Sequence, residues 1–244
     1  MPFKNKNFPF IIFAAGKSRR FQSRIKKIPK VLFIINGKPL IQYVLDTAGL
    51  MGAKNIFIVV DYKKEIIMRI LGKKYKGIKI KYIINENSKG LVDNLSKLAF
   101  FVNSDFVLLL GDEIYINSKH GEMISFYKKN HCDGICGVRE DTPRMIKKNY
   151  SVKIINKKIS EVMEKPDMVK NVLQGCGTYI FKSDVFNFIK KVPINKKTGK
   201  KELVDLIQIM INNGKKILPF NLGGLYVNVN KKEDLTAAKK IIKK

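Results

Sequence analysis

The sequence has 244 residues, of which 45% are hydrophobic, and its 48 Lys and Arg against 20 Asp and Glu give a formal net charge of +28. Such an apolar fraction predicts a folded core and excludes a disordered basic chain. With three cysteines and no repeat, the composition also excludes a disulfide scaffold, a collagen-like chain and a coiled coil.

Short apolar runs alternate with longer amphipathic stretches through the first half of the chain. Strands are predicted at 8–14, 55–60, 78–84, 106–110 and 134–138. Helices are predicted between them at 39–50, 63–71, 91–101 and 122–130. This alternation is typical of a mostly parallel sheet with helices on both faces.

After residue 141 the pattern changes. Strands at 150–155, 159–163 and 178–181 follow one another with little helix between them and predict a small antiparallel extension of the sheet. Helices are predicted again at 183–191, 202–212 and 233–242. Because no linker or low-complexity segment interrupts the chain, we expect a single α/β domain over residues 1–244, with a Rossmann-like mixed sheet.

The positive charge is spread along the whole chain in groups of two or three lysines. No helix-turn-helix, zinc-finger or aromatic RNA-binding signature accompanies it, so we expect no nucleic-acid partner. A small anionic substrate would be attracted by the same field. The cysteines form no C-x-x-C pair and indicate buried core thiols in a cytoplasmic protein. No apolar run approaches the roughly 20 residues that a membrane span needs, so no membrane insertion is expected.

The first motif follows the first predicted strand. Its small residues let backbone N–H groups come close to phosphate oxygens, and Arg20 and Lys30 add cationic donors. The loop residues are Ala14, Ala15, Gly16 and Lys17. The spacing fits neither a Walker loop nor a dinucleotide-binding fingerprint.

The second motif is Gly111-Asp112 at the end of the apolar strand predicted at 106–110. In α/β sheets ligands bind beside the carboxyl ends of the strands. A carboxylate placed there can hold Mg²⁺ against a triphosphate, because Mg²⁺ prefers oxygen ligands and takes few of them from the protein. An Asp at a strand end can also simply cap a turn.

Residues 14–40, a small-residue loop followed by Pro29-Lys30, resemble the signature of the sugar-phosphate nucleotidylyltransferase superfamily. They look especially like the uridylyltransferase domain of UDP-N-acetylglucosamine pyrophosphorylase and like glucose-1-phosphate thymidylyltransferases. The similarity runs from Phe8 to about Leu235, with five motifs in order. It implies the nucleotide-diphospho-sugar transferase type of fold, in which the first half binds the NTP and the second half the acceptor.

Several site residues are expected from this resemblance. Asn85, Gly90 and Leu91 match the place where thymidylyltransferases read the base, and Gly111 would also contact the nucleotide. Arg20 would stabilise the departing pyrophosphate and Lys30 the α-phosphate.

The acceptor side of the site is implied by a Glu-Lys-Pro segment that begins at Glu164 and by a later Gly-x-Tyr segment that begins at Gly177. By resemblance Lys165 would hold the phosphate of a sugar phosphate, and Glu164 a sugar hydroxyl. This segment favours a sugar phosphate as the acceptor.

The last motif, residues 226–235, ends the last strand of the chain and opens the last helix. Relatives place a second metal ligand here, and Asn230 falls in the register of the uridylyltransferase, while Asn228, the second choice, falls in that of the thymidylyltransferases. Asn230 would also suit the N-cap of the last helix.

These motifs together predict a Mg²⁺-dependent enzyme that joins an NTP and a sugar 1-phosphate to give an NDP-sugar and pyrophosphate, with Asp112 and Asn230 as metal ligands. Two alternatives stay open: cytidylyl transfer to a non-sugar phosphate such as phosphocholine or an alditol phosphate, and a non-catalytic nucleotide-sugar-binding regulatory protein. The sequence is compatible with a homo-oligomer and names neither the base nor the sugar.

Overall fold

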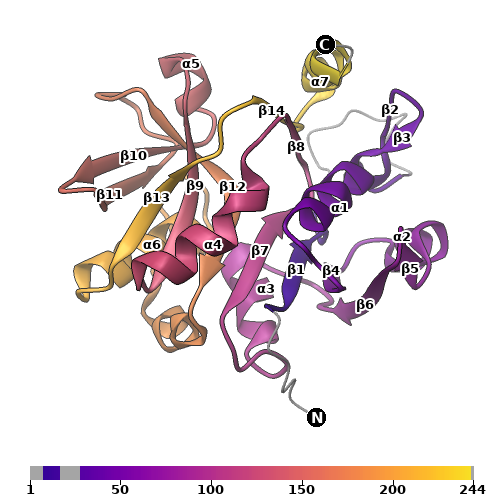
Figure 1. The fold of residues 1–244 in the computed structure, drawn as a ribbon, viewed down its shortest axis with the longest axis horizontal. Coiled ribbons are helices and arrows are strands. Elements are labelled where there is room, and N and C mark those ends of the chain that lie inside the picture. Colours follow the sequence, from indigo (N-terminus) through magenta and orange to yellow (C-terminus); the bar gives the residue numbers. More distant parts are fainter. Residues whose placement is uncertain (1–7, 17–27, 243–244) are drawn as a thin grey trace. The chain divides into compact units, whose positions relative to one another are not determined.

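The computed structural model describes residues 8–16 and 28–242 (Figure 1). Counting described residues only, the chain forms two compact units that interleave in the sequence. Unit 1 contains Phe8, Lys89–Val107 and Met123–Leu222, and unit 2 contains the described residues of 9–88, Leu108–Glu122 and the described residues of 223–244. The division passes through strand β7 (Phe106–Leu110) and helix α4 (His120–Asn130).

Unit 2 is built on parallel strands. Strand β1 (Phe10–Phe13) lies between β7 and β4 (Asn55–Val60), and β4 pairs in parallel with β6 (Ile78–Ile84). The residues of β1 are all buried, as expected for a parallel strand covered on both faces. Strand β6 alternates buried isoleucines with lysines, and beyond it lies only the short antiparallel strand β5 (Lys74–Tyr75). Charged residues on such an outer strand oppose pairing with other chains.

The helices between these strands follow from local sequence. Helix α1 (Leu40–Leu50) begins directly after a proline, whose fixed φ suits a helix start. Helix α2 (Lys64–Leu71) buries one face through Ile67 and Leu71. It ends at Gly72, whose φ of 64° lies in the left-handed region that glycine tolerates.

Unit 2 also carries short elements beside its parallel strands (Figure 1), and several of them contribute to one apolar cluster. These elements are the 3-10 turn η1 (Lys30–Leu32), β2 (Ile34–Ile35), β3 (Lys38–Pro39), β8 (Glu113–Ile116), β14 (Leu225–Asn228) and helix α7 (Lys232–Ile242). The buried members of the cluster are Phe33, Ile35, Leu40, Ile114, Val227, Val229 and Ala238. Strands β8 and β14 pair antiparallel and thereby hold the residues after β7 against those before α7.

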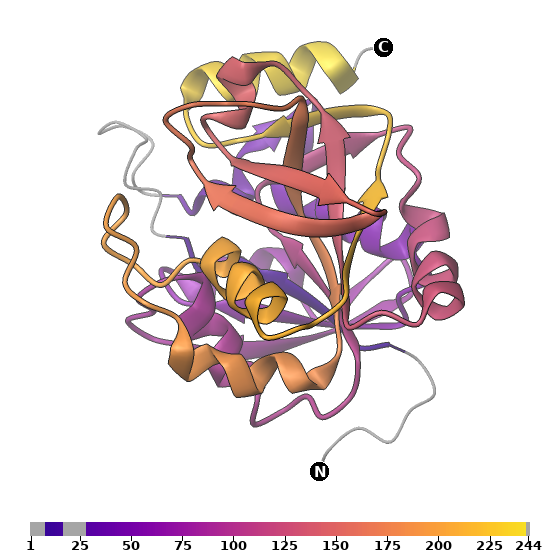
Figure 2. The same cartoon turned by 90° about the vertical axis from the view of Figure 1, so that its left-hand side faces the viewer.

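Unit 1 contains a mostly antiparallel sheet, whose β10 and β11 are drawn in red and orange tones in Figure 2. Its strands run in the order β11 (Lys158–Glu164), β10 (Tyr150–Ile155), β12 (Leu173–Phe181), β9 (Gly134–Glu140) and β13 (Ile217–Asn221). Only β13 pairs in parallel, with β9. The unit's helical segments are α3 (Leu91–Leu98), the larger part of α4, α5 (Pro143–Ile146), the 3-10 helix η2 (Ser183–Lys191) and α6 (Leu203–Asn212). Helix α6 packs on β11, and its Gln208 side chain accepts a hydrogen bond of 2.8 Å from the Val162 N–H.

The predicted α/β class, with mostly parallel strands and an antiparallel extension, is confirmed. The segment predicted as a helix at 183–191 is a 3-10 helix, in which the buried Val185 and Phe188 lie three residues apart and so share one face. Strand β12 begins at Leu173 rather than at 178. In the described ranges, no helix is long and apolar enough to cross a bilayer.

One of the two histidines is fully buried at the start of α4. The Nδ1 atom of His120 lies 2.7 Å from the Ser118 hydroxyl, and its ring packs edge-on against Tyr115 at 4.5 Å between centroids. Burial lowers the pKa of His120 from 6.5 to about 3, because the imidazolium would lose its hydration. His120 is therefore neutral in the folded protein at neutral pH.

We expect this histidine to weaken the protein in mild acid. Below pH 6.5 His120 binds a proton in the unfolded chain, whereas in the folded chain it stays neutral down to about pH 3. Its contribution to the free energy of unfolding is therefore complete above pH 6.5 and decreases as the pH falls. At pH 5 the loss should be about 2 kcal/mol. Urea unfolding at pH 7 and pH 5 should show this loss in the wild type and not in His120→Phe.

The exposed histidine provides the control for this prediction. His131 lies at the surface with a φ of 44°, a conformation that asparagine accepts, so His131→Asn should retain the acid sensitivity of the wild type. An equal loss of stability in His120→Phe would show that other groups cause it.

Candidate active site

Three residues predicted from separate parts of the sequence meet in unit 2. The ammonium of Lys30 is hydrogen-bonded and ion-paired to the Asp112 carboxylate, and it lies 3.3 Å from the amide oxygen of Asn230. The Lys30 and Asp112 side chains are 12% and 23% exposed, so the pair is shielded but reachable from solvent. Here a carboxylate and an amide oxygen converge on one cation.

The backbone explains why Lys30 and Asp112 arrive at the same place. Val31 and Leu32 of η1 are buried, which fixes the turn and directs Lys30 away from the core. Gly111 donates a 3.0 Å hydrogen bond to the Phe13 carbonyl at the end of β1. A side chain on Gly111 would come within 2.7 Å of that carbonyl, so only glycine permits this approach and brings Asp112 to the end of the parallel strands.

Asn230 reaches the site through the alternation of the chain after β14. Val227 and Val229 face the apolar cluster, so Asn228 and Asn230 face the other way. The Asn230 Nδ2 donates to the Asn228 Oδ1 at 2.8 Å, while the Asn230 Oδ1 faces Lys30. The structure therefore places Asn230 beside Asp112 and places Asn228 behind it.

Helix α7 is capped by another residue. The Asp234 carboxylate accepts hydrogen bonds from the backbone N–H groups of Asn230 and Lys231, at 2.8 and 2.9 Å. The side chain of Asn230 bonds to Asn228 and Lys30 instead of the helix N–H groups. The N-cap interpretation of this side chain is thus not what the structure shows.

The oxygens of Asp112 and Asn230 fit a divalent cation by their chemistry. They already surround a positive charge, and carboxylate and amide oxygens are ligands that Mg²⁺ accepts. Among the described residues no group of three or more His, Cys, Asp or Glu side chains could hold a metal. A cation at this place would therefore rest on one carboxylate together with neutral oxygens.

The phosphate loop is described only in part. Ala14 and Ala15 are buried, and the Ala14 N–H donates to the Val59 carbonyl at 2.9 Å, so they extend the pairing of β1 with β4. Gly16 is exposed, and apart from its chain neighbours no described residue lies within 4 Å of the position of a Cβ on it. Lys17 and Arg20 lie outside the described residues.

The residues expected to read the base are divided between the two units. Asn85 follows β6 in unit 2, where its N–H donates to the Val60 carbonyl at 3.0 Å. Gly90, in unit 1, has a φ of 149° and precedes α3, whose first residue is Leu91. Within unit 1, a side chain on Gly90 would contact the backbone of Lys201 at 3.5 Å, so the segment before α6 passes this turn.

The acceptor residues of unit 1 form an ion pair at the end of β11. The Lys165 ammonium lies 2.6 Å from the Glu164 carboxylate, and their side chains are 33% and 13% exposed. Burial raises the pKa of Glu164, which outweighs the lowering by Lys165, and the nearby Glu202 and Asp205 raise it further. The lysine is the more accessible partner and is the one that can bind a phosphate.

The backbone of Lys165 is held in a conformation that lysine rarely adopts. Its φ is 42°, and it is fixed by two hydrogen bonds: its N–H donates to the Asn149 carbonyl at 2.8 Å, and the Lys197 ammonium donates to its carbonyl at 3.2 Å. Strained residues of this kind gather at functional sites. Gly177 lies in the same unit, buried in β12, where the pairing with β9 is irregular between Gly175 and Tyr179.

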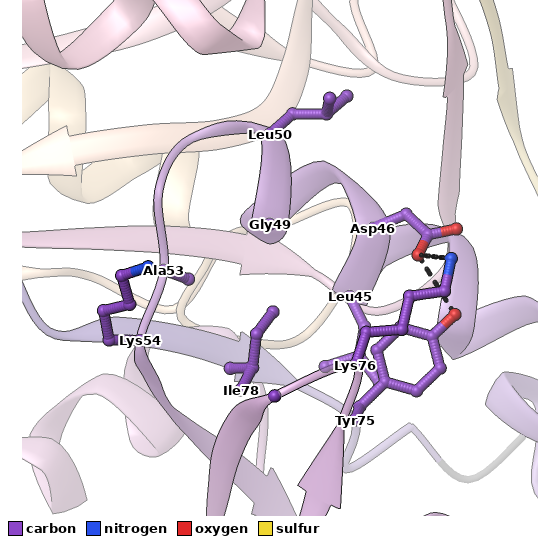
Figure 3. A pocket seen from close by; sticks show the side chains of 10 residues that line it. Leu45, Asp46, Gly49, Leu50, Ala53, Lys54, Tyr75, Lys76 and Ile78 are labelled. Atoms are coloured by element: carbon purple, nitrogen blue, oxygen red, sulfur yellow. Dashed lines mark hydrogen bonds and ion pairs between the residues drawn. The ribbon is translucent and has the colours of Figure 1, made fainter.

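A pocket of about 520 Å³ lies in unit 2, apart from these residues (Figure 3). Asp46 on its wall is paired with Lys38 and Lys76 and accepts a 3.0 Å hydrogen bond from Tyr75. Burial acts to raise the pKa of Asp46, but the hydrogen bonds from Lys38 and Lys76 outweigh it and leave that pKa below its usual value. The lining residues are Leu45, Asp46, Gly49, Leu50, Ala53, Lys54, Tyr75, Lys76, Gly77 and Ile78. None of them belongs to the predicted site.

One buried carboxylate beside the site was missed by sequence reasoning. Glu113 directly follows Asp112, is 3% exposed and bonds to the side chains of Tyr115, Tyr226 and Asn228. The alternation of polar and apolar residues from Tyr226 onward was the available signal, because it places Tyr226 and Asn228 on one face of a strand.

Comparison with known proteins identifies the family of this chain. A family model described as nucleotidyl transferase matches residues 10–244. A UTP–glucose-1-phosphate uridylyltransferase of Haloferax volcanii, AglF, is 30% identical over 227 residues, which cover 92% of each chain. The bifunctional protein GlmU of Methanocaldococcus jannaschii is 27% identical over 95% of this chain, which spans 53% of that relative's length.

Solved structures show the same fold. A UDP-glucose pyrophosphorylase complexed with UDP-glucose superposes with a TM-score of 0.86 at 23% identity, covering 97% of this chain and 98% of the other. A putative glucose-1-phosphate thymidylyltransferase from Bacillus anthracis gives a TM-score of 0.85 at 20% identity, covering 96% of this chain and 94% of the other. The nucleotide-diphospho-sugar transferase type of fold is thereby confirmed. The chain belongs to the nucleotidyl transferase family, as its motifs predicted.

Proposed function

We propose that this enzyme is a Mg²⁺-dependent sugar-1-phosphate nucleotidylyltransferase, which converts an NTP and a sugar 1-phosphate into an NDP-sugar and pyrophosphate. The observation that carries the proposal is the convergence of Asp112 and Asn230 on the ammonium of Lys30, beside the ends of β1 and β7. The name of the Haloferax relative supports UTP and glucose 1-phosphate as the first pair to test.

The reaction requires little acid–base chemistry. An oxygen of the acceptor phosphate attacks the α-phosphorus of the NTP and forms a new P–O bond. The bond from the α-phosphorus to the oxygen that bridges to the β-phosphorus breaks, and its electron pair leaves with pyrophosphate. Because the acceptor phosphate is already ionised at neutral pH, no general base has to take a proton. Catalysis then rests on positioning and on neutralising charge.

Each side chain has a role in this scheme. Lys30 holds the α-phosphate, and to do so its ammonium exchanges the Asp112 carboxylate for a phosphate oxygen. Lys165 binds and orients the attacking phosphate, while Glu164, which keeps its ammonium in place, meets a sugar hydroxyl. Arg20, outside the described residues, stabilises the leaving pyrophosphate.

The metal belongs at Asp112 and Asn230. When bound there, Mg²⁺ would neutralise part of the triphosphate charge. Asp112 supplies the one negative ligand, and Asn230 a neutral one. The Lys30 ammonium lies at the same oxygens, so cation binding and the release of Lys30 toward the phosphate are expected to go together.

Pyrophosphate release tests the proposal. The protein is incubated with UTP, dTTP, CTP, GTP or ATP against hexose 1-phosphates and hexosamine 1-phosphates, with and without Mg²⁺. We expect turnover for one base and a narrow set of sugars, and only with Mg²⁺. Phosphocholine and alditol phosphates are included as acceptors.

Two results would contradict the proposal. Turnover of CTP with phosphocholine or an alditol phosphate alone would identify a non-sugar cytidylyltransferase. No turnover with any pair, accompanied by binding of nucleotides, would identify a binding protein without catalysis.

A further inference from the structure

A row of side chains in unit 2 leads from the buried Glu113 to the metal site proposed above. The Asn228 Nδ2 donates to the Glu113 Oε1 at 3.4 Å, the Asn230 Nδ2 donates to the Asn228 Oδ1 at 2.8 Å, and the Asn230 Oδ1 lies 3.3 Å from the Lys30 ammonium. These three contacts connect a carboxylate that no substrate could reach with an oxygen that faces the site.

The strand register sets this row. In the antiparallel pair of β8 and β14, Glu113 lies opposite Asn228 and Tyr115 opposite Tyr226. Side chains directly opposite each other point to the same face of a sheet. Because the alternate residues Ile114 and Val227 are buried in the apolar cluster, a slip by one residue would bury the polar face, so the register is strongly specified.

Each contact in the row determines which way the next amide points. A carboxylate oxygen can only accept, so Asn228 must turn its NH₂ group toward Glu113. The Asn228 oxygen then faces Asn230, which must answer with its own NH₂ group. The oxygen of Asn230 is left pointing at Lys30 and Asp112. With the opposite orientation, the Asn230 NH₂ group would face the cation, and an NH₂ group cannot act as a ligand of a cation.

The other hydrogen bonds of Glu113 hold it in this position. The Tyr226 hydroxyl donates to the same Oε1 at 2.8 Å, and the Tyr115 hydroxyl donates to Oε2. With Glu113 only 3% exposed, its carboxylate is fixed by the protein and not by water.

We propose that Glu113 is a positioning residue that acts through Asn228 to keep the amide oxygen of Asn230 turned toward the cation. This inference rests on the proposed function, in which Asn230 is a metal ligand. Groups behind a ligand that fix its orientation typically contribute about 10- to 100-fold to metal affinity.

Two variants break the row at different points. Glu113→Leu removes the acceptor at its start, and Asn228→Ala removes the middle amide, which is half-buried and more tolerant of change. Both should bind Mn²⁺ about 10- to 100-fold more weakly than the wild type, measured by electron paramagnetic resonance with Mn²⁺ alone. The Mg²⁺ concentration for half-maximal pyrophosphate release should rise, while the KM for the sugar phosphate stays the same.

Two further variants separate this role from a merely structural one. Glu113→Gln keeps a carbonyl oxygen for Asn228 and should restore Mn²⁺ binding, because the tyrosine hydroxyls can donate or accept. Tyr115→Phe removes the bond to Oε2 but leaves the bonds of Tyr226 and Asn228 to Oε1, so it should lower Mn²⁺ affinity much less than Glu113→Leu.

The outcomes distinguish this inference from the function it rests on. Wild-type Mn²⁺ affinity in both Glu113→Leu and Asn228→Ala, in a protein whose turnover needs Mg²⁺, would overturn the positioning role and leave the proposed function standing. A wild type that neither binds Mn²⁺ nor needs a metal for turnover would overturn both.

Discussion

Replacing Lys30 by alanine is expected to lower kcat by about 10²- to 10³-fold, the usual loss when one contact to a developing charge is removed. In the structure its ammonium is held by Asp112 and Asn230, so it is positioned in advance for the phosphate that we propose it binds. The affinity for a metal ion should not fall in this variant. Without the competing ammonium, Asp112 and Asn230 should bind Mn²⁺ at least as tightly as in the wild type.

A second lysine–carboxylate pair in unit 2 provides the matched control. Lys38 is paired with Asp46, as Lys30 is with Asp112, and Asp46 lies on the wall of the pocket in Figure 3. Lys38→Ala should leave kcat within about twofold of the wild type, because Lys38 is not part of the proposed site. Loss of its part-exposed ion pair should also lower the free energy of unfolding only slightly. Equal rates for Lys30→Ala and the wild type would show that Lys30 has no part in the reaction.

Gly224→Ala is expected to lower the free energy of unfolding by about 3 kcal/mol or more, from a left-handed φ and overpacking combined. Gly224 precedes β14 with a φ of 64°, and an added Cβ would overlap the Ile116 carbonyl oxygen and lie 2.7 Å from that of Asn117. These are backbone atoms at the end of β8, so no rotation of a side chain relieves the contact. Urea unfolding measures the loss.

The preceding glycine separates the two causes. Gly223 has a similar φ of 58°, but among the described residues other than its chain neighbours the nearest atoms to an added Cβ belong to the Lys119 side chain, at 3.9 Å. Gly223→Ala should therefore lower the free energy of unfolding only by the cost of a left-handed φ in alanine, about 1–2 kcal/mol. Equal losses in the two variants would mean that the turn adapts and that close packing against β8 is unimportant.

The central strands could be predicted because each is a continuous apolar run with turn residues at its ends. Strands β4, β6, β7 and β10 have the predicted bounds. The strands β2, β3 and β5 were not predicted, because each has only two residues and so shows no periodicity. Strand β13 contains Pro219, which argues against a strand in sequence and is tolerated where a ladder hydrogen bond is not required.

Strand β12 shows why long-range packing limits prediction. Its first half contains glycines, which are poor strand formers, and the sequence gives no reason for them. In the structure a side chain at Gly175 would overlap the ring of Tyr150, whose hydroxyl donates to the Cys176 carbonyl at 3.2 Å. The reason for the glycine lies on another strand.

The candidate site, like the fold, could be predicted from the sequence only in part. Asp112 could be predicted as a candidate from its place at a strand end, because ligands of α/β sheets gather there, whereas Lys30 and Asn230 were predicted from their resemblance to the family's motifs. The pairing of Lys30 with Asp112, and the choice of Asn230 over Asn228 beside them, depend on the orientation of β14. Glu113 was missed because its partners are determined by the register of β8 with β14, which local patterns do not encode.

The most direct test of the account compares the Mg²⁺ dependence of pyrophosphate release in the wild type and in Asp112→Asn. The variant keeps the size of the side chain and removes its charge, and Asp46→Asn serves as the control at another lysine-paired carboxylate. We predict that Asp112→Asn needs more Mg²⁺ and has a kcat lowered by about 10²-fold or more, while Asp46→Asn follows the wild-type curve. A wild-type Mg²⁺ curve and rate in Asp112→Asn would contradict the assignment of this site to nucleotidyl transfer.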